Sequence, residues 1–334
     1  MIFAVTSPSS SHLVGLSAWQ AKTRKALIGH AAARWLLSYL LEGISFMLPS
    51  DMDYTLGPDA IHRPTTPVQH RDEEYDQTGF DTLWAMQEKH FWYRGRHRFL
   101  LGALDRYQPS GQPPWSAVDL GGGVGGWVRY LADRRPTQFS PLALADSSET
   151  ALRMAGDALP TGVARYQIDL MNLGWQAQWD CAFLLDVIEH LPDDVQAMRQ
   201  AAQALKPGGL LFVTTPALKQ FWSYNDDLAH HLRRYNRKDY AALAQASGLE
   251  LLDARYFMFL LSPLYWLARQ RPGVRDMSVE QQRQLLQDSH KVPSAPLNLA
   301  LTAAFDRFVQ TQSYVIVWSD DFFKILAPEQ TPAQ

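Results

Sequence analysis

The sequence predicts an α/β protein whose mostly parallel sheet is covered by helices on both faces. From Trp115 onward, short apolar runs alternate with segments whose apolar residues recur at helical spacing. A glycine-rich loop lies between the first of these runs and the first helical segment. Regular alternation of strands and helices is typical of doubly wound sheets.

Six strands are expected in this part of the chain. Each is a run of four to eight mostly apolar residues bounded by turn residues or by a helical pattern. The expected strands are Ser116–Leu120, Leu142–Ala145, Val163–Ile168, Cys181–Leu185, Leu210–Thr214 and Leu249–Tyr256. The segments between them carry helical patterns such as Val124, Val128 and Leu131.

The charge and the cysteine content of the chain indicate which partners and which cellular compartment to expect. The 334 residues are 46% hydrophobic and carry a net charge of −3, so the chain can build a core but has no basic excess for nucleic acid. A single cysteine, Cys181, excludes intrachain disulfides and cysteine-based zinc sites. We therefore expect a cytoplasmic protein without bound nucleic acid.

The two ends differ from the middle. Residues 1–75 are rich in Ser, Pro and His around one helical patch, Ala32–Leu48, and are expected to be a loosely attached extension and linker. An equal alternative is that Met52 is the natural start. Residues 1–51 are therefore expected to add nothing to the sheet. Residues 76–270 form the predicted main domain, and residues 271–334 form a helical extension.

The glycine-rich loop is the first candidate binding element. Val118–Gly126 reads VDLGGGVGG, with Asp119 ending the strand and Gly121 and Gly123 in the turn. Glycines permit a sharp turn and a close approach of a ligand, and the following helix N-terminus offers free N–H groups. The loop also satisfies G-x-G-x-x-G, so by itself it would suit a dinucleotide.

Acidic residues follow the next two strands. Asp146, followed by Ser147, ends the second strand, where a carboxylate can accept both hydroxyls of a ribose. It could equally cap the helix that begins near Ser148, or do both. Asp169 ends the third strand, where it can accept a hydrogen bond from an adenine amino group.

Two later segments complete a recognisable order of motifs. DVIEHLPD begins at Asp186 after the fourth strand, and LKPGG begins at Leu205 before the fifth. With the glycine loop and the acidic tip, this order resembles the class I S-adenosylmethionine-dependent methyltransferases, over about Phe91–Arg269. The resemblance implies a Rossmann-like sheet of seven strands in the order 3-2-1-4-5-7-6, with S-adenosylmethionine as the methyl donor.

The same resemblance assigns roles around the donor. It implies that Gly121, Asp146 and Leu185 line the donor pocket, and that Arg96 on the preceding helix meets the donor's carboxylate. The antiparallel seventh strand has Tyr314–Trp318 as its candidate.

Within the superfamily, the chain looks closest to methyltransferases of small, often lipid-linked acceptors, including the ubiquinone-biosynthesis O-methyltransferases. Those proteins carry E-x-x-E-H where this chain has Asp186, Glu189 and His190. Related enzymes suggest a divalent metal there, but this ligand set suits magnesium poorly and zinc only moderately. We therefore expect no metal, with Glu189 and His190 orienting the turn and facing the acceptor.

The loop after the fifth strand is the second candidate catalytic segment. It contains His230 and His231, followed by a basic cluster of Arg233, Arg234, Arg237 and Lys238. A histidine here can take the proton from an acceptor hydroxyl. Equally, the loop can position anionic groups such as phosphate through its arginines. His190 and His231 are the candidate catalytic residues.

One apolar segment favours a hydrophobic acceptor. Tyr256–Ala268 holds 13 uncharged residues, too few to span a bilayer. Its Tyr265 and Trp266, with arginines directly after, are typical of contact with a membrane surface. The segment then receives a lipid-linked acceptor at the inner membrane surface. Packing of the segment into the core is the alternative.

Two other functions use the same loop. A nicotinamide-dependent oxidoreductase of one common subclass needs Tyr-x-x-x-Lys, and no lysine here has a tyrosine four positions before it. A non-catalytic cofactor-binding protein is the second alternative. The complete set of Asp119, Gly121, Gly123 and Asp146 argues against lost cofactor binding.

Overall fold

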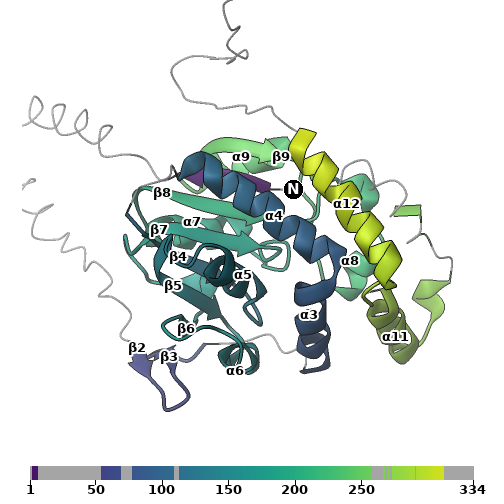
Figure 1. Ribbon diagram of the computed structural model, residues 1–334, viewed down its shortest axis with the longest axis horizontal. Helices are drawn as coiled ribbons and strands as arrows, with labels where there is room; N and C mark the ends of the chain where they lie inside the picture. Colours follow the sequence, from purple (N-terminus) through teal and green to yellow (C-terminus); the bar gives the residue numbers. More distant parts are fainter. Residues whose placement is uncertain are drawn as a thin grey trace, which may run out of the picture.

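A nine-stranded sheet forms the centre of the molecule (Figure 1). The computed structural model describes residues 2–6, 54–68, 77–108, 113–257, 266–267, 270, 273–289 and 291–311. The strand order is β2-β3-β6-β5-β4-β7-β8-β1-β9. The strands are β1 Ile2–Thr6, β2 Tyr54–Leu56, β3 Ile61–Pro64, β4 Trp115–Leu120, β5 Phe139–Asp146, β6 Ala164–Gln167, β7 Trp179–Leu185, β8 Leu205–Thr214 and β9 Glu250–Arg255.

The six predicted strands are confirmed as β4 to β9. Strands β6, β5, β4, β7 and β8 are neighbours in that order and pair in parallel. The predicted turn LKPGG lies inside β8 rather than before it, and the register against β7 shifts at this point, between Trp179 and Cys181. Because these five strands are parallel, their carboxyl ends lie along the same edge of the sheet. The loops that follow the strands therefore lie together at that edge.

The antiparallel strand between β8 and β9 comes from an unexpected place. Ile2–Thr6, as β1, pairs antiparallel with both neighbours and takes the seventh position of the expected order. The expectation that residues 1–51 add nothing to the sheet is therefore wrong for these five residues. This strand has only five residues, and its partners lie more than 200 residues away in the sequence. Such a short apolar run has no periodicity from which a strand can be predicted. Tyr314–Trp318 lies outside the described residues.

The predicted linker also contributes strands. β2 and β3 form a hairpin, and β3 pairs in parallel with β6 at the far side of the sheet. Ile61 is fully buried, and the ring of His62 stacks on Tyr166 with centroids 4.6 Å apart. The prolines that indicated a linker lie in the turn of this hairpin, at the last position of β3 or after it, so they do not interrupt the strand. The domain boundary at residue 76 stays a prediction.

Helices cover both faces of the sheet, as predicted. The described α-helices are α3 Gln77–Lys89, α4 Phe91–Tyr107, α5 Gly126–Arg134, α6 Glu149–Gly156, α7 Asp194–Ala204, α8 Tyr224–Leu228, α9 Arg237–Ala246, α11 Val279–Ser289 and α12 Ala295–Thr311. Alternate residues of a strand face opposite sides. Accordingly Val118 packs with the core of α7 and α9, whereas Ala117 packs with the core of α4, α5 and α6.

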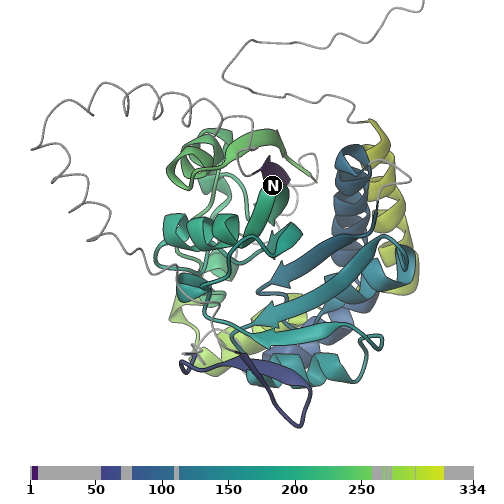
Figure 2. The same cartoon turned by 90° about the vertical axis from the view of Figure 1, so that its left-hand side faces the viewer.

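The helix α12 lies along α4 in both views (Figures 1 and 2). Its Asn298 accepts a hydrogen bond from the Phe91 backbone and donates one to the Lys89 carbonyl, so it fixes the junction of α3 and α4. Among the described helices, none is long and apolar enough to cross a bilayer. Ala32–Leu48 and most of Tyr256–Ala268 lie outside the described residues.

Candidate active site

The glycine loop connects β4 to α5, which is the strand–loop–helix context predicted from the sequence. Gly121 and Gly123 have φ angles of 75° and 56°, in the left-handed region that favours glycine. A Cβ at Gly121 would lie 2.8 Å from Val187 Cγ2, so the loop also packs closely against the turn after β7. The backbone therefore needs glycine for both conformation and space.

Asp146 holds the glycine loop in place. Its carboxylate accepts hydrogen bonds from the backbone N–H groups of Gly123 and Ser148, each at 2.8 Å. Ser148 is itself the N-cap residue of α6. The expectation that Asp146 caps this helix is therefore wrong, because Ser148 is the cap; the Asp146 carboxylate instead ties the tip of β5 to the loop after β4.

Asp119 lies beneath this loop. Its side chain is buried, and Oδ1 has no hydrogen-bond partner among the residues the structure describes. Burial raises the pKa of Asp119 to about 7; the nearby Arg96 charge opposes this rise and Asp146 adds to it. A carboxyl in this state favours a neighbouring cationic ligand, which would hold it in the ionised form.

Arg96, on α4, is 4% exposed and reaches the same edge of the sheet. Its Nη1 lies 2.5 Å from Asp186 Oδ2, and its guanidinium lies over the Tyr93 ring. Asp186 in turn accepts a hydrogen bond from Thr214. Arg96 is therefore inside the molecule as expected, but in this structure it faces a protein carboxylate. Its Nε has no partner within the described part of the chain.

The remaining predicted donor residues lie at the same edge. Leu185 is the buried last residue of β7, and Ser147 follows the last residue of β5. Asp169 follows β6, and its side chain accepts a hydrogen bond from the Met171 backbone at 2.9 Å. This local bond starts a short 3-10 helix, so one Asp169 oxygen has a structural role.

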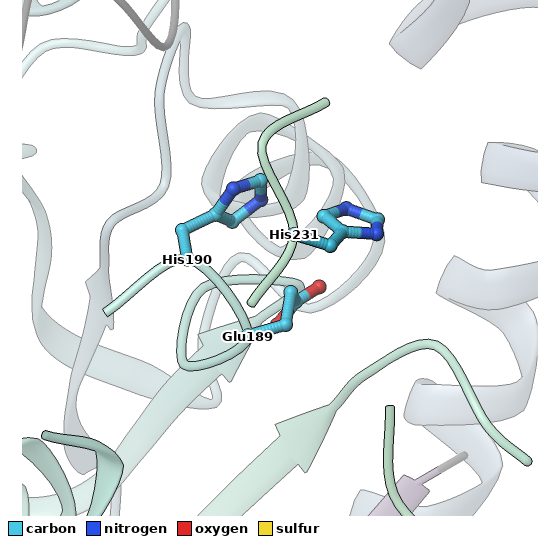
Figure 3. A group of neighbouring side chains, drawn as sticks. All are labelled: Glu189, His190 and His231. Carbon is cyan, nitrogen blue, oxygen red and sulfur yellow. The ribbon is translucent and has the colours of Figure 1, made fainter. Parts of the chain in front are cut away.

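A second group of side chains gathers beside the turn after β7 (Figure 3). Glu189, His190 and His231 each present a ligand-type atom, and these atoms lie within 4.8 Å of one another. The two imidazole rings are 4.8 Å apart between centroids. The Leu232 backbone donates a hydrogen bond to the Glu189 carbonyl, which joins the two loops. The structure thus brings together both predicted catalytic histidines.

Glu189 is fully buried, and neither carboxylate oxygen has a hydrogen-bond partner among the described residues. Burial, followed by the nearby charge of Asp186, raises the pKa of Glu189 well above its usual value. Burial and the neighbouring His231 lower the pKa of His190 to about 4. His190 is therefore uncharged at neutral pH, and burial disfavours the charged form of Glu189.

Asp226 controls the orientation of His231. His231 Nδ1 lies 2.9 Å from Asp226 Oδ1, and Arg234 makes two hydrogen bonds to the same carboxylate. Burial by itself would raise the pKa of Asp226, but the hydrogen bonds from His231 and Arg234 hold it below its usual value. The buried carboxylate fixes the ring, so its Nε2 remains available on the other side.

Two of the four side chains of the basic cluster are engaged by carboxylates of the protein. Arg234 is engaged by Asp226, and Arg233 pairs with Asp194 at 2.9 Å and donates to two backbone carbonyls. Two of the four predicted phosphate-binding side chains therefore have structural partners, which weakens the alternative that this loop positions anions.

Asp226 is a site residue that the sequence analysis missed. It forms a capping box with Ser223, in which the Asp226 carboxylate accepts from the Ser223 backbone. The pattern S-x-x-D just before a pair of histidines was the available signal. It indicates a helix start, and only the folded loop brings the same carboxylate to His231.

Comparisons with known proteins concern the domain that contains this site. A family model described as a methyltransferase domain matches residues 91–254. Trans-aconitate 2-methyltransferase of Azoarcus sp. (strain BH72) is 33% identical over 150 residues, covering 44% of this chain and 56% of that protein. Phosphoethanolamine N-methyltransferase 2 of Caenorhabditis elegans is 25% identical over 202 residues, covering 56% of this chain and 46% of that protein.

These matches span about half the length of the curated relatives. Among solved structures, an S-adenosylmethionine dependent methyltransferase from Mesorhizobium loti is 30% identical, covers 35% of this chain and 53% of that chain, and has a TM-score of 0.31. The matched region contains the glycine loop, Asp146 and the DVIEH segment. Residues 91–254 therefore form a methyltransferase domain of the class I S-adenosylmethionine-dependent type.

Proposed function

We propose that this protein transfers the methyl group of S-adenosylmethionine to a small-molecule acceptor. The observation that carries the proposal is the arrangement of two unlike groups at one edge of the sheet. One comprises the glycine loop with Asp146 and Arg96, and the other comprises Glu189, His190 and His231. The first suits the donor and the second suits an acceptor.

On the donor side, Asp146 accepts hydrogen bonds from the ribose hydroxyls, since each carboxylate oxygen can accept more than one hydrogen bond. Asp119 faces the cationic methionine end, and Arg96 binds the methionine carboxylate in exchange for part of its contact with Asp186. Leu185 packs against the donor, and Asp169 and Ser147 supply hydrogen bonds around the nucleoside.

On the acceptor side, the Asp226–His231 pair handles the proton of the nucleophile. Hydrogen bonding to Asp226 leaves His231 Nε2 as the acceptor of a proton from a hydroxyl or amine. The nucleophile then forms a bond to the methyl carbon while the carbon–sulfur bond breaks. Its electron pair stays on sulfur, which becomes a neutral thioether. Because the donor is already activated, alignment and exclusion of water supply most of the acceleration.

The acceptor's finer class is a hydrophobic or lipid-linked molecule. Leu232 is a large apolar side chain that is 52% exposed. Leu232 directly follows His231, so an apolar acceptor tail would have a surface beside the reacting group. The two curated relatives are named for small anionic acceptors. These acceptors are therefore the competing class to test.

Labelled donor tests the proposal. The full chain is incubated with S-adenosylmethionine carrying a labelled methyl group and with separate polar and lipid extracts, and the labelled product is identified. Label in a small molecule of the lipid extract, absent with Asp146→Ala, is the expected result. Label only in the polar extract would contradict the hydrophobic acceptor, and no label in either would contradict methyl transfer.

Flotation tests contact with a membrane surface. Vesicles containing anionic lipid should carry the protein upward, and Trp266→Glu should abolish this while leaving donor binding unchanged. Wild-type protein that stays at the bottom of the gradient would contradict the peripheral membrane contact.

A further inference from the structure

We propose that Glu189, His190 and His231 bind one divalent transition-metal ion of the zinc type on the acceptor side. The inference rests on the proposed function for the ion's use, but not for its binding. The three ligand atoms come from two separate loops and lie within 4.8 Å of one another (Figure 3). In a tetrahedral zinc site with bonds of about 2.1 Å, ligand atoms are about 3.4 Å apart. Small side-chain rotations close this difference.

The Glu189 carboxylate is the first independent sign of a ligand. It is fully buried, and both oxygens lack a hydrogen-bond partner among the described residues. Buried carboxylates in proteins are almost always hydrogen-bonded, paired with a cation or bound to a metal. His190 Nδ1, also buried, lacks a partner as well. A buried carboxylate and an imidazole nitrogen that both lack a hydrogen-bond partner among the described residues therefore lie together, which suits a cation.

The contact between Asp226 and His231 is the second sign. A histidine that binds a metal usually donates its other ring N–H to a carboxylate, which fixes the tautomer and the direction of the ring. His231 Nδ1 lies 2.9 Å from Asp226 Oδ1. Arg234 and Ser223 hold that carboxylate in turn. These contacts hold the His231 ring in one orientation, which leaves Nε2 available to bind a metal ion.

The ligand set differs from the one that the sequence grouped. Asp186 is occupied by Arg96 and Thr214, and His231 takes its place beside Glu189 and His190. The set therefore changes from two carboxylates and one imidazole to one carboxylate and two imidazoles. The chemical argument against a bound metal was made for the set of Asp186, Glu189 and His190. Two imidazoles and one carboxylate are the ligands of many catalytic zinc sites, which leave a fourth position open.

A bound divalent ion would lower the pKa of an acceptor hydroxyl, so that its proton passes to water, and would fix its oxygen. His231 then acts as a ligand rather than as a base. Asp226 orients the ring in both cases, and Glu189 balances part of the positive charge in the buried site.

Metal binding is measured directly on the full chain. The protein is stripped with chelator, dialysed against Zn²⁺ or Co²⁺, and its metal content is determined. One equivalent of Zn²⁺ is expected, and Co²⁺ should give the intense visible absorption of a four-coordinate site. Glu189→Gln, which keeps the shape of the side chain, and His231→Gln should each lose at least tenfold in affinity. Asp226→Asn should lose 10- to 100-fold.

His230→Asn is the matched control, because it changes the neighbouring histidine of the same loop and asparagine tolerates the left-handed φ of 54° found there. This variant should bind Zn²⁺ like wild type. Less than 0.1 equivalent of Zn²⁺ in wild type, or equal affinity in wild type and folded Glu189→Gln, would overturn the proposal. Methyl transfer by metal-free protein would leave the proposed function intact. Metal binding without donor binding would remove only the proposed function.

Discussion

The donor and acceptor sides of this site are built in different ways. On the donor side, the Asp146 carboxylate accepts two backbone hydrogen bonds and fixes the glycine loop before any ligand arrives. On the acceptor side, the equally buried Glu189 carboxylate has no partner among the described residues. Unsatisfied buried groups are costly, so they point to a group that binds there.

The difference also separates what each side contributes. In the proposed function, donor binding depends on a backbone loop that is held in one conformation, whereas turnover depends on side chains that meet across two loops. Substitutions on the donor side should therefore change mainly donor affinity, whereas substitutions on the acceptor side should change mainly kcat.

The largest effect is expected on turnover from His231→Gln. The substitution removes the group that Asp226 orients toward the acceptor, so kcat should fall by about 10²–10⁴-fold. Because Asp226 keeps its bonds to Arg234, the loop should remain folded. Steady-state kinetics and donor calorimetry on the same preparation measure both. A fall in donor affinity equal to the fall in kcat would show that the two sides are not separate.

Asp146→Ala should have the largest effect on donor affinity. It removes the ribose acceptor and leaves the N–H groups of Gly123 and Ser148 without their carboxylate, at a cost of about 1–3 kcal/mol or more. This corresponds to a loss of about tenfold to more than a hundredfold in affinity for the demethylated donor. Asp169→Ala is the control and should lose less. Wild-type affinity in Asp146→Ala would remove the carboxylate from the donor site.

Arg96→Lys should weaken donor binding by about tenfold. The guanidinium can bind a carboxylate through two parallel hydrogen bonds, and an ammonium group cannot. Lysine still supplies the charge beside Asp186, so the variant should fold. Arg94→Lys, an exposed position on the same helix, is the matched control. Calorimetry that gives equal affinities for both variants and wild type would place Arg96 outside the pocket.

The smallest effect concerns pH and Asp119. The pKa of this carboxyl is about 7 in the folded protein and near its ordinary value of 3.8 in the unfolded chain. The folded state therefore binds the extra proton, and stability falls as pH rises from about 4 to about 7. Above pH 7 the Asp119 carboxyl is ionised in the folded protein as well, and the full loss of stability is present. Asp119→Asn removes it, so its Tm should match wild type near pH 4 and exceed it by a few degrees at pH 8.

Melting curves without donor across this pH range measure the effect. A Tm difference that stays constant with pH would contradict the raised pKa. Added donor, which carries positive charge, should reduce the wild-type penalty at pH 8.

The sequence predicted the strand–loop–helix unit around the glycine loop correctly because its signals are local. Strand β4, the loop at Gly121 and Gly123, and helix α5 follow one another within 20 residues, so periodicity and glycine spacing are sufficient. Arg96 was expected inside the molecule and is buried there. Its pairing with Asp186, 90 residues away, needed the fold.

The acceptor side and the seventh strand depend on distant pairing. His190 and His231 were each proposed from their own loops, but their contact and the role of Asp226 arise where two loops meet. Strand β1 reaches its position between β8 and β9 from the other end of the chain. Its five residues form an apolar run too short to carry a reliable period.

Calorimetric titration of the full chain with S-adenosylmethionine, and separately with NAD, tests the central claim most directly. We expect one saturable site for S-adenosylmethionine, with no heat of binding for NAD. Donor affinity in Glu189→Gln should equal that of wild type, because Glu189 is proposed to lie on the acceptor side. Binding of NAD with no binding of S-adenosylmethionine would contradict the assignment of the glycine loop to a methyl donor.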